Sequence, residues 1–135
     1  MLVWDKSYKI GQEEMDGEHL ILFALLNQLN ININDDRAGE CVGDVLNALG
    51  SYIDYHFAHE EALMRSCGYP GLDAHAAKHQ EFVQELSLLR EKAKGADALQ
   101  AALKVRAFVL DWLLGHILET DVDYAGFMAG QVRTA

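Results

Sequence analysis

The chain repeats apolar residues at spacings of three and four in four separate blocks, which matches the period of an α-helix. It contains a single proline, Pro70, and proline is the residue that most strongly breaks helix interiors. The blocks predict helices at about 16–33, 37–66, 72–94 and 97–118. Four amphipathic helices with short connections pack most simply in up-down-up-down order, so we expect an all-α four-helix bundle.

The segments outside these blocks are short and predict no second domain. Residues 1–15 mix aromatic and apolar side chains without a helical period, which predicts an ordered N-terminal arm. The segment Cys67–Gly71 contains a proline and two glycines, which predicts a tight connection between the second and third helices. After Thr120 we expect a short C-terminal tail. Residues 1–135 are therefore expected to form one domain, because this length suits one ordinary core.

The chain is acidic, with 21 acidic and 11 basic residues that give a formal charge of −10 and a pI near 4.8. Nucleic acids and anionic membranes bind clusters of Lys and Arg, so neither is an expected partner. The longest apolar run, Leu20–Leu26, is far shorter than the roughly 20 residues that span a bilayer, and we expect no membrane insertion. The N-terminus does not resemble a signal peptide, and Cys41 and Cys67 suggest no disulfide framework, so we expect a cytoplasmic protein.

Histidines occupy unusual positions in the predicted helices. Five of the six histidines fall on apolar faces, at least one in every helix, and one glutamate joins them. Burying this many imidazoles and a carboxylate costs several kcal/mol unless each group finds a partner. Metal coordination would satisfy them together. The candidate ligands on these faces are His19, His56, Glu60, His75, His79 and His116.

Two pairs of candidate ligands have a spacing that favours a common centre. His56 and Glu60 are four residues apart, and so are His75 and His79. Side chains at this spacing project from one face of a helix toward the same point.

A third pair, His116 and Asp121, has a less regular spacing of five residues. On an ideal α-helix this spacing turns the two side chains about 140° apart. If both bind one centre, the helix must tighten, bulge or end between Leu118 and Thr120. Thr120 and Asp121 are weak helix formers, which makes an end of the helix there reasonable.

Seven candidate ligands are too many for one metal ion of ordinary coordination. Five imidazoles, two bridging carboxylates and one bridging oxo or hydroxo group make about eleven contacts, and two octahedral ions offer about twelve positions. The one vacancy is where a small molecule would bind. Five imidazoles exclude an oxygen-only calcium or magnesium site, and no set of thiolates suggests structural zinc. The ligand types suit iron, with manganese or cobalt as alternatives.

Several motifs follow one another in order along essentially the whole chain. They are Trp4…Tyr8-Lys9-Ile10-Gly11, Asp16-Gly17-Glu18-His19, His56-Phe57-Ala58-His59-Glu60-Glu61…Met64, Gly68-Tyr69-Pro70, His75-x-x-x-His79-x-x-Phe82 and Trp112-Leu113-Leu114-Gly115-His116-Ile117…Asp121…Tyr124. In this order and spacing the chain resembles the hemerythrin family, most closely its single-domain bacteriohemerythrins.

The resemblance to hemerythrins implies a non-haem di-iron centre, in which two iron ions share an oxo or hydroxo bridge and O2 is a reversible ligand. It also implies that three histidines bind one iron, that two histidines bind the other, which keeps the vacancy, and that two carboxylates bridge them. By position, these ligands are His75, His79 and His116 for the first iron, His19 and His56 for the second, and Glu60 and Asp121 for the bridges.

Apolar residues close to the ligands in sequence are expected to line the O2 pocket and to keep water out. These residues are Leu22, Phe57, Phe82, Leu113 and Ile117. Among their neighbours, we expect His59 in solvent or at the rim of the site, Glu61 as a surface charge and Trp112 as a core aromatic. Tyr124 suits a hydrogen bond near Asp121 and simple packing equally well.

The predicted function is reversible O2 binding for oxygen transport, storage or delivery, rather than catalysis, with a side peroxidase activity left open. The main alternative is an enzyme that uses the same site, either a peroxidase or a nitric-oxide handling protein. A further alternative is an oxygen or iron sensor or reservoir. We expect a monomer or weak oligomer, with O2 as its ligand and a protein that accepts the O2 and is not identified by the sequence.

Overall fold

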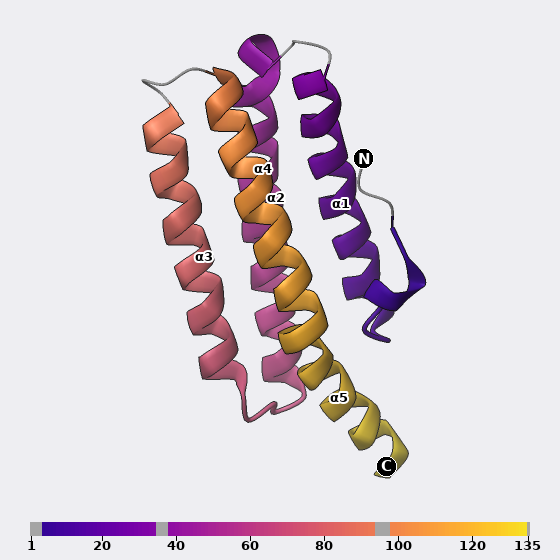
Figure 1. The fold of residues 1–135 in the computed structure, drawn as a ribbon. Helices are drawn as coiled ribbons and strands as arrows, with labels where there is room; N and C mark the ends of the chain where they lie inside the picture. Colours follow the sequence, from indigo (N-terminus) through magenta and orange to yellow (C-terminus); the bar gives the residue numbers. More distant parts are fainter. Residues whose placement is uncertain (1–3, 35–37, 94–97, 135) are drawn as a thin grey trace.

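The computed structural model describes residues 4–34, 38–93 and 98–134, and every regular element in these ranges is helical. The four long helices are α1 (Glu13–Asn34), α2 (Ala38–Ser66), α3 (Leu72–Ala93) and α4 (Ala98–Gly115). They run side by side in up-down-up-down order (Figure 1). α1 and α3 each pack against both α2 and α4. The four-helix bundle predicted from the sequence is therefore confirmed.

The N-terminal arm is ordered by aromatic packing against α1. It contains one 3-10 turn, η1 (Lys6–Tyr8), which begins where the Asp5 carboxylate accepts a hydrogen bond from the Ser7 backbone N–H. The ring of Tyr8 stacks on Phe23 of α1, with ring centroids 5.4 Å apart. The arm thus covers part of the large apolar cluster described below.

Helix α1 begins at Glu13, three residues before the start expected at Asp16. The Gln12 side chain accepts a hydrogen bond from the Met15 backbone N–H at 2.9 Å, which caps the first turn. Asp16 instead accepts hydrogen bonds from two backbone N–H groups of the arm, including that of Gly11 at 3.3 Å. This carboxylate therefore ties the arm to the helix.

The C-terminal segment differs from the short tail that we expected. The chain stays helical after α4, through a π-helical turn, η2 (His116–Asp121), and a further helix, α5 (Val122–Thr134). α5 extends beyond the ends of the other helices (Figure 1). A π turn accommodates an extra residue without ending the helix, which the low helix propensity of Thr120 did not reveal. Burial of Tyr124 stabilises the first turn of α5.

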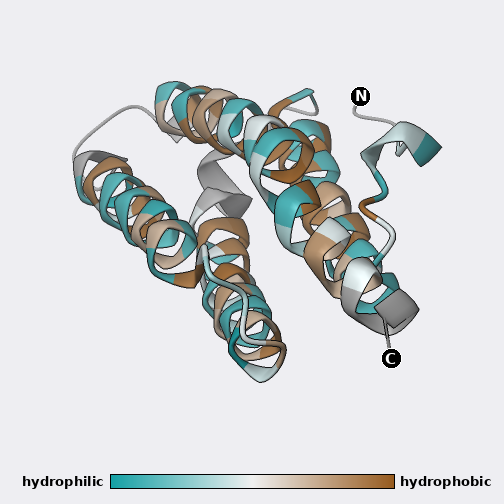
Figure 2. Cartoon of the chain, turned by 90° about the horizontal axis from the view of Figure 1, so that it is seen from below, coloured by the Kyte–Doolittle hydropathy of each residue, from teal (hydrophilic) through white to brown (hydrophobic). Residues whose placement is uncertain are grey.

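Two apolar clusters fill the interior of the bundle. Seen along the bundle, each helix has both hydrophobic and hydrophilic segments (Figure 2). The large cluster takes residues from all four long helices, and the small cluster consists of Met15, Met64 and Tyr124. Buried polar residues contact both clusters, because Phe57 of the large cluster stacks on His79 and Tyr124 of the small cluster contacts Glu60. These buried polar residues therefore lie between two apolar clusters.

The absence of a disulfide framework between the two cysteines and the absence of a membrane-spanning segment were also predicted from the sequence. Cys67 is half-buried, and its thiol donates a hydrogen bond to the Met64 carbonyl at 3.3 Å. The side chain of Cys41 lies outside the described residues, so the expectation for it stays a prediction. In the described ranges, every helix is too short or too polar to cross a lipid bilayer.

Candidate metal centre

The structure brings all seven candidate ligands together inside the bundle. Each of them is at most 5% exposed, although five are histidines and two are carboxylates. α1 contributes one ligand, and α2, α3 and η2 contribute two each. In that order the ligands are His19, His56 and Glu60, His75 and His79, and His116 and Asp121.

The π-helical turn η2 explains how His116 and Asp121 reach the same place. Residues five apart lie on one side of a π-helix, because its hydrogen bonds join residues i and i+5. The Nε2 atom of His116 and the Oδ1 atom of Asp121 are 2.9 Å apart. The sequence left open whether the helix tightens, bulges or ends between His116 and Asp121, and the structure shows a π-helical bulge.

The ligands form two sets that share Glu60. The three-histidine set consists of Glu60, His75, His79 and His116, and the two-histidine set consists of His19, His56, Glu60 and Asp121. In each set the potential ligand atoms all lie within 4.8 Å of one another. Each set therefore has a size and composition suitable for one metal ion.

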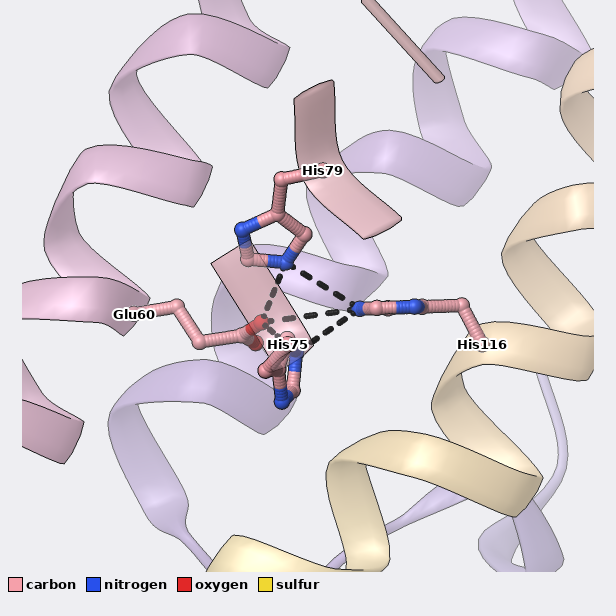
Figure 3. A group of neighbouring side chains, drawn as sticks. All are labelled: Glu60, His75, His79 and His116. Carbon is pink, nitrogen blue, oxygen red and sulfur yellow. Dashed lines mark hydrogen bonds and ion pairs between the residues drawn. The ribbon is translucent and has the colours of Figure 1, made fainter. Parts of the chain in front are cut away.

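In the three-histidine set, imidazole nitrogens converge on one carboxylate oxygen (Figure 3). The Nε2 atom of His116 lies 2.9 Å from that of His75 and 3.1 Å from that of His79. The Oε1 atom of Glu60 lies 2.9 Å from Nε2 of both His75 and His79. The Nε2 atom of His116 lies farther from this oxygen, at 3.7 Å. All four side chains are close enough together to contact one metal ion.

The two-histidine set is more open. The Nε2 atom of His19 lies 3.2 Å from Oδ2 of Asp121 and 3.8 Å from Oε2 of Glu60. The Nε2 atom of His56 lies 3.5 Å from the same Glu60 oxygen. Because Oδ1 of Asp121 also lies 3.0 Å from Nε2 of His75, an ion in the three-histidine set would have five protein ligands, whereas an ion bound here would have four.

Each carboxylate divides its two oxygens between the two sets. Glu60 directs Oε1 toward the three-histidine set and Oε2 toward His19 and His56. Asp121 places Oδ1 3.0 Å from Nε2 of His75, and it places Oδ2 beside His19. This is the arrangement that a carboxylate needs to bridge two neighbouring metal ions.

Several buried polar atoms lack a hydrogen bond despite these short distances. Within the described residues, both ring nitrogens of His19 and both carboxylate oxygens of Asp121 have no partner with acceptable hydrogen-bond geometry. A buried polar atom without a partner costs about 1–3 kcal/mol. Metal ions at the points of convergence would satisfy Nε2 of His19 and both oxygens of Asp121, so the residues fit a metal-binding role.

The metal-free site balances its charges with protons. Burial lowers the pKa of His19 and His75, but Asp121 and Glu60 outweigh it and raise the pKa of each histidine to about 9. The same carboxylates raise the pKa of His116 against the effect of burial. Burial raises the pKa of Glu60 and Asp121, yet the surrounding histidines hold both well below their usual values. Metal binding would therefore displace protons from the histidines.

Two glutamates next to the ligands have a role that the sequence reasoning missed. Glu18 accepts a hydrogen bond from Nδ1 of His56 at 2.8 Å, and Glu61 accepts one from Nδ1 of His79 at 3.0 Å. The interpretation of Glu61 as a surface charge was wrong, because its side chain is only 28% exposed and is bonded to His79. Neighbouring residues lie about 100° apart on a helix, so apolar periodicity assigns these glutamates to the surface.

Tyr124 of α5 completes the surroundings of Glu60. Its hydroxyl donates a hydrogen bond to Oε2 of Glu60 at 3.0 Å, and its side chain is buried. Burial and the nearby Glu60 and Asp121 raise its pKa, so the hydroxyl keeps its proton and stays a donor. Of the two roles considered for Tyr124, the structure shows both packing and hydrogen bonding, with Glu60 rather than Asp121 as the acceptor.

The expected pocket residues lie in the large apolar cluster, and each is at most 5% exposed. They are Leu22, Phe57, Phe82, Leu113 and Ile117. Phe57 stacks on His79 with centroids 3.8 Å apart, and the half-buried Trp112 stacks on His116 at 4.1 Å. Aromatic rings therefore cover two ligands of the three-histidine set.

A family comparison bears directly on this site. The model of the hemerythrin HHE cation-binding domain matches residues 10–127, which include all seven candidate ligands. The chain belongs to the hemerythrin family. Hemerythrin domains bind a di-iron centre, and the two buried ligand sets of this chain are suited to hold one.

Individual hemerythrins match nearly the whole chain. A bacteriohemerythrin of Clostridium acetobutylicum is 29% identical over 128 residues, which cover 92% of this chain and 98% of that protein. A hemerythrin of Siphonosoma cumanense is 35% identical over 125 residues, which cover 92% and 91%. The crystal structure of a wild-type hemerythrin superposes with a TM-score of 0.82 at 29% identity, covering 93% of this chain and 96% of that one. The similarity thus includes both sequence and fold.

Proposed function

We propose that this hemerythrin-family chain binds O2 reversibly at a di-iron centre, as an oxygen carrier, store or delivery protein. The division of each carboxylate between the two ligand sets is the observation that carries the proposal. It supports two neighbouring ions rather than one. The proposed ligands are His75, His79 and His116 for one iron, His19 and His56 for the other, and Glu60 and Asp121 as bridges.

The unequal number of histidines favours O2 binding on one side of the centre. The two-histidine set has one imidazole fewer, so its iron would keep an open position. A bound pair of ferrous ions would supply two electrons to O2 on binding and would take them back when O2 leaves. The five pocket residues are proposed to line the open position and to exclude water.

The surroundings of the site support reversible binding over catalysis. Histidines are neutral ligands, so the site carries less negative charge than a carboxylate-rich one and stabilises high-valent iron less. The apolar clusters on both sides slow the delivery of protons from solvent. Hemerythrin relatives are oxygen-binding proteins rather than enzymes. The cytoplasmic location, the oligomeric state and the protein acceptor stay predictions.

Cycling between air and vacuum tests the proposed function. The ferrous protein should develop visible charge-transfer absorption in air and should lose it under vacuum, over repeated cycles, with two iron ions per chain by metal analysis. Irreversible oxidation in the first cycle, with turnover of added peroxide, would support the enzyme alternative instead.

Leu113 provides a test of the proposed pocket. It is 4% exposed and precedes His116 by three residues. Replacing it with alanine should let water reach the site, and the oxygenated protein should autoxidise several times faster in air, as followed by the loss of its visible absorption.

Leu29→Ala is the matched control for Leu113→Ala. Leu29 is also buried in the large cluster, but it lies ten residues, or about 15 Å along α1, from His19. This variant should lose about 2–5 kcal/mol of stability and keep the wild-type autoxidation rate. Equal autoxidation rates in all three proteins would remove Leu113 from the pocket.

A further inference from the structure

The two histidines of the two-histidine set are held in different ways. His56 donates a hydrogen bond from Nδ1 to Oε1 of Glu18 at 2.8 Å, and its Nε2 atom faces Glu60. His19 has no hydrogen-bond partner on either ring nitrogen within the described residues. Because the two nitrogens of imidazole are on a rigid ring, a bond at Nδ1 fixes the direction of Nε2. Only His56 is oriented in this way.

Glu18 is itself held firmly in place. It is 8% exposed, and its second oxygen, Oε2, accepts a hydrogen bond from Nδ1 of His59 at 2.5 Å. The other ring nitrogen of His59 lies 3.2 Å from Oε2 of Glu14, at the surface. Both oxygens of Glu18 are therefore occupied, which restricts the rotation of its carboxylate. A fixed acceptor aligns His56 better than a mobile one.

The three-histidine set has its own separate carboxylate. Glu61 accepts the hydrogen bond from Nδ1 of His79, whose Nε2 atom lies in that set. Glu18 and Glu61 thus each contact one ligand, and these two ligands belong to different sets. Carboxylates that bond a ligating histidine usually change metal affinity by 10–100-fold when they are replaced.

We propose that Glu18 is a positioning residue that, through His56, sets the metal affinity of the two-histidine set independently of the three-histidine set. Glu61 has the corresponding role for the three-histidine set, through His79. This inference rests on the proposed two-metal centre. It adds that different residues set the metal affinity of the two positions, and that Glu18 sets the affinity of the position proposed to bind O2.

Titration of the metal-free protein with Co2+ under nitrogen tests this proposal. Calorimetry and the visible absorption of Co2+ resolve the two binding steps and their coordination. We expect two ions per chain for the wild type. Glu18→Gln should weaken one step by 10–100-fold and leave the other within twofold. Glu61→Gln should weaken the other step, by a smaller factor because Glu61 is more exposed.

Glu14→Gln is the matched control for Glu18→Gln. It removes the same charge one helical turn earlier on α1, at a side chain that is 65% exposed and contacts no ligand. Both binding steps should stay within twofold of the wild type in this variant. Circular dichroism should show the same helix content in all four proteins, so that a loss of folding is recognised.

The outcomes separate the positioning role from the site itself. Different steps weakened by Glu18→Gln and Glu61→Gln would support the proposal. Equal weakening of both steps by Glu18→Gln, which a general structural role would produce, would overturn it, and so would wild-type affinities in that variant. A wild-type chain that binds one ion or none would contradict the two-metal centre on which the inference rests.

Discussion

Glu60→Gln is expected to reduce the iron content from two ions per chain to well below one. Glu60 belongs to both ligand sets, with one oxygen directed at each. Glutamine removes the negative charge and replaces one of these oxygens by an NH2 group, which cannot bind a metal cation. One position therefore loses its Glu60 ligand, and the other has a neutral amide oxygen in place of a carboxylate oxygen, so a single substitution weakens iron binding at both. Metal analysis after loading with ferrous iron and removal of excess iron measures the effect.

The control for Glu60→Gln is the same change at an exposed position. Glu85→Gln on the surface of α3 should retain two iron ions and the wild-type visible spectrum. Circular dichroism should show that Glu60→Gln keeps its helices, since the apolar clusters are unchanged. A Glu60→Gln variant that holds two iron ions with the wild-type spectrum would contradict the bridging role.

Iron loading is expected to raise the melting temperature of the chain by more than about 10 °C. The ligands come from α1, α2, α3 and η2, so they are brought together only in the folded bundle. A ligand that binds only the folded state stabilises it by about 4 kcal/mol at a free concentration a thousand times its Kd. For a chain of this size, each kcal/mol raises the melting temperature by roughly 3 to 4 °C. Thermal unfolding under nitrogen, with and without ferrous iron, measures the difference.

The difference in melting temperature between the iron-loaded and the metal-free protein should increase as the pH rises. In the metal-free protein, carboxylates raise the pKa of His19 and His75 to about 9 against the effect of burial. Groups with a raised pKa stabilise the fold fully below their unfolded pKa of about 6.5, and this stabilisation is lost as the pH rises through about 9. Loaded protein has metal in place of these protons. Melting curves between about pH 6.5 and 8.5 should therefore show the metal-free form losing stability while the loaded form does not.

Glu60→Gln also serves as the control for the thermal experiment. Because this variant should hold little iron, its melting temperature should change by only a small amount when iron is added. A wild-type melting temperature that does not respond to iron would show that the folded chain has no preferred metal site.

The residues that form the bundle were predictable because their signal is local. The apolar stripe of each helix repeats within one stretch of sequence, so periodicity alone identified four helices and their buried faces. The buried histidines were found by the same reasoning, since His56 and His79 interrupt an apolar stripe. The conflict between a polar side chain and a buried position can be recognised without knowing which helices are neighbours.

Other features depend on contacts between segments that are far apart in sequence. The π turn at His116 is favoured when both His116 and Asp121 face the same buried centre, and helix propensities do not contain that information. The hydrogen bond of Glu18 to His56 joins α1 to α2, and that of Tyr124 to Glu60 joins α5 to α2. Each of these residues has an ordinary position in its own helix.

The sequence by itself determined the apolar face of each helix and showed that the histidines on those faces need partners, because amphipathic periodicity and the cost of desolvation act on each helix separately. Only the tertiary structure decided which carboxylate oxygen faces which histidine. It directed the two oxygens of Glu60 and of Asp121 toward different histidines. It also gave Nδ1 of His56 a buried carboxylate as hydrogen-bond acceptor, whereas Nδ1 of His19 has no hydrogen-bond partner among the described residues. The physical reason is that the direction of a hydrogen bond or a metal ligand depends on where neighbouring helices lie, and packing of the whole bundle sets those positions.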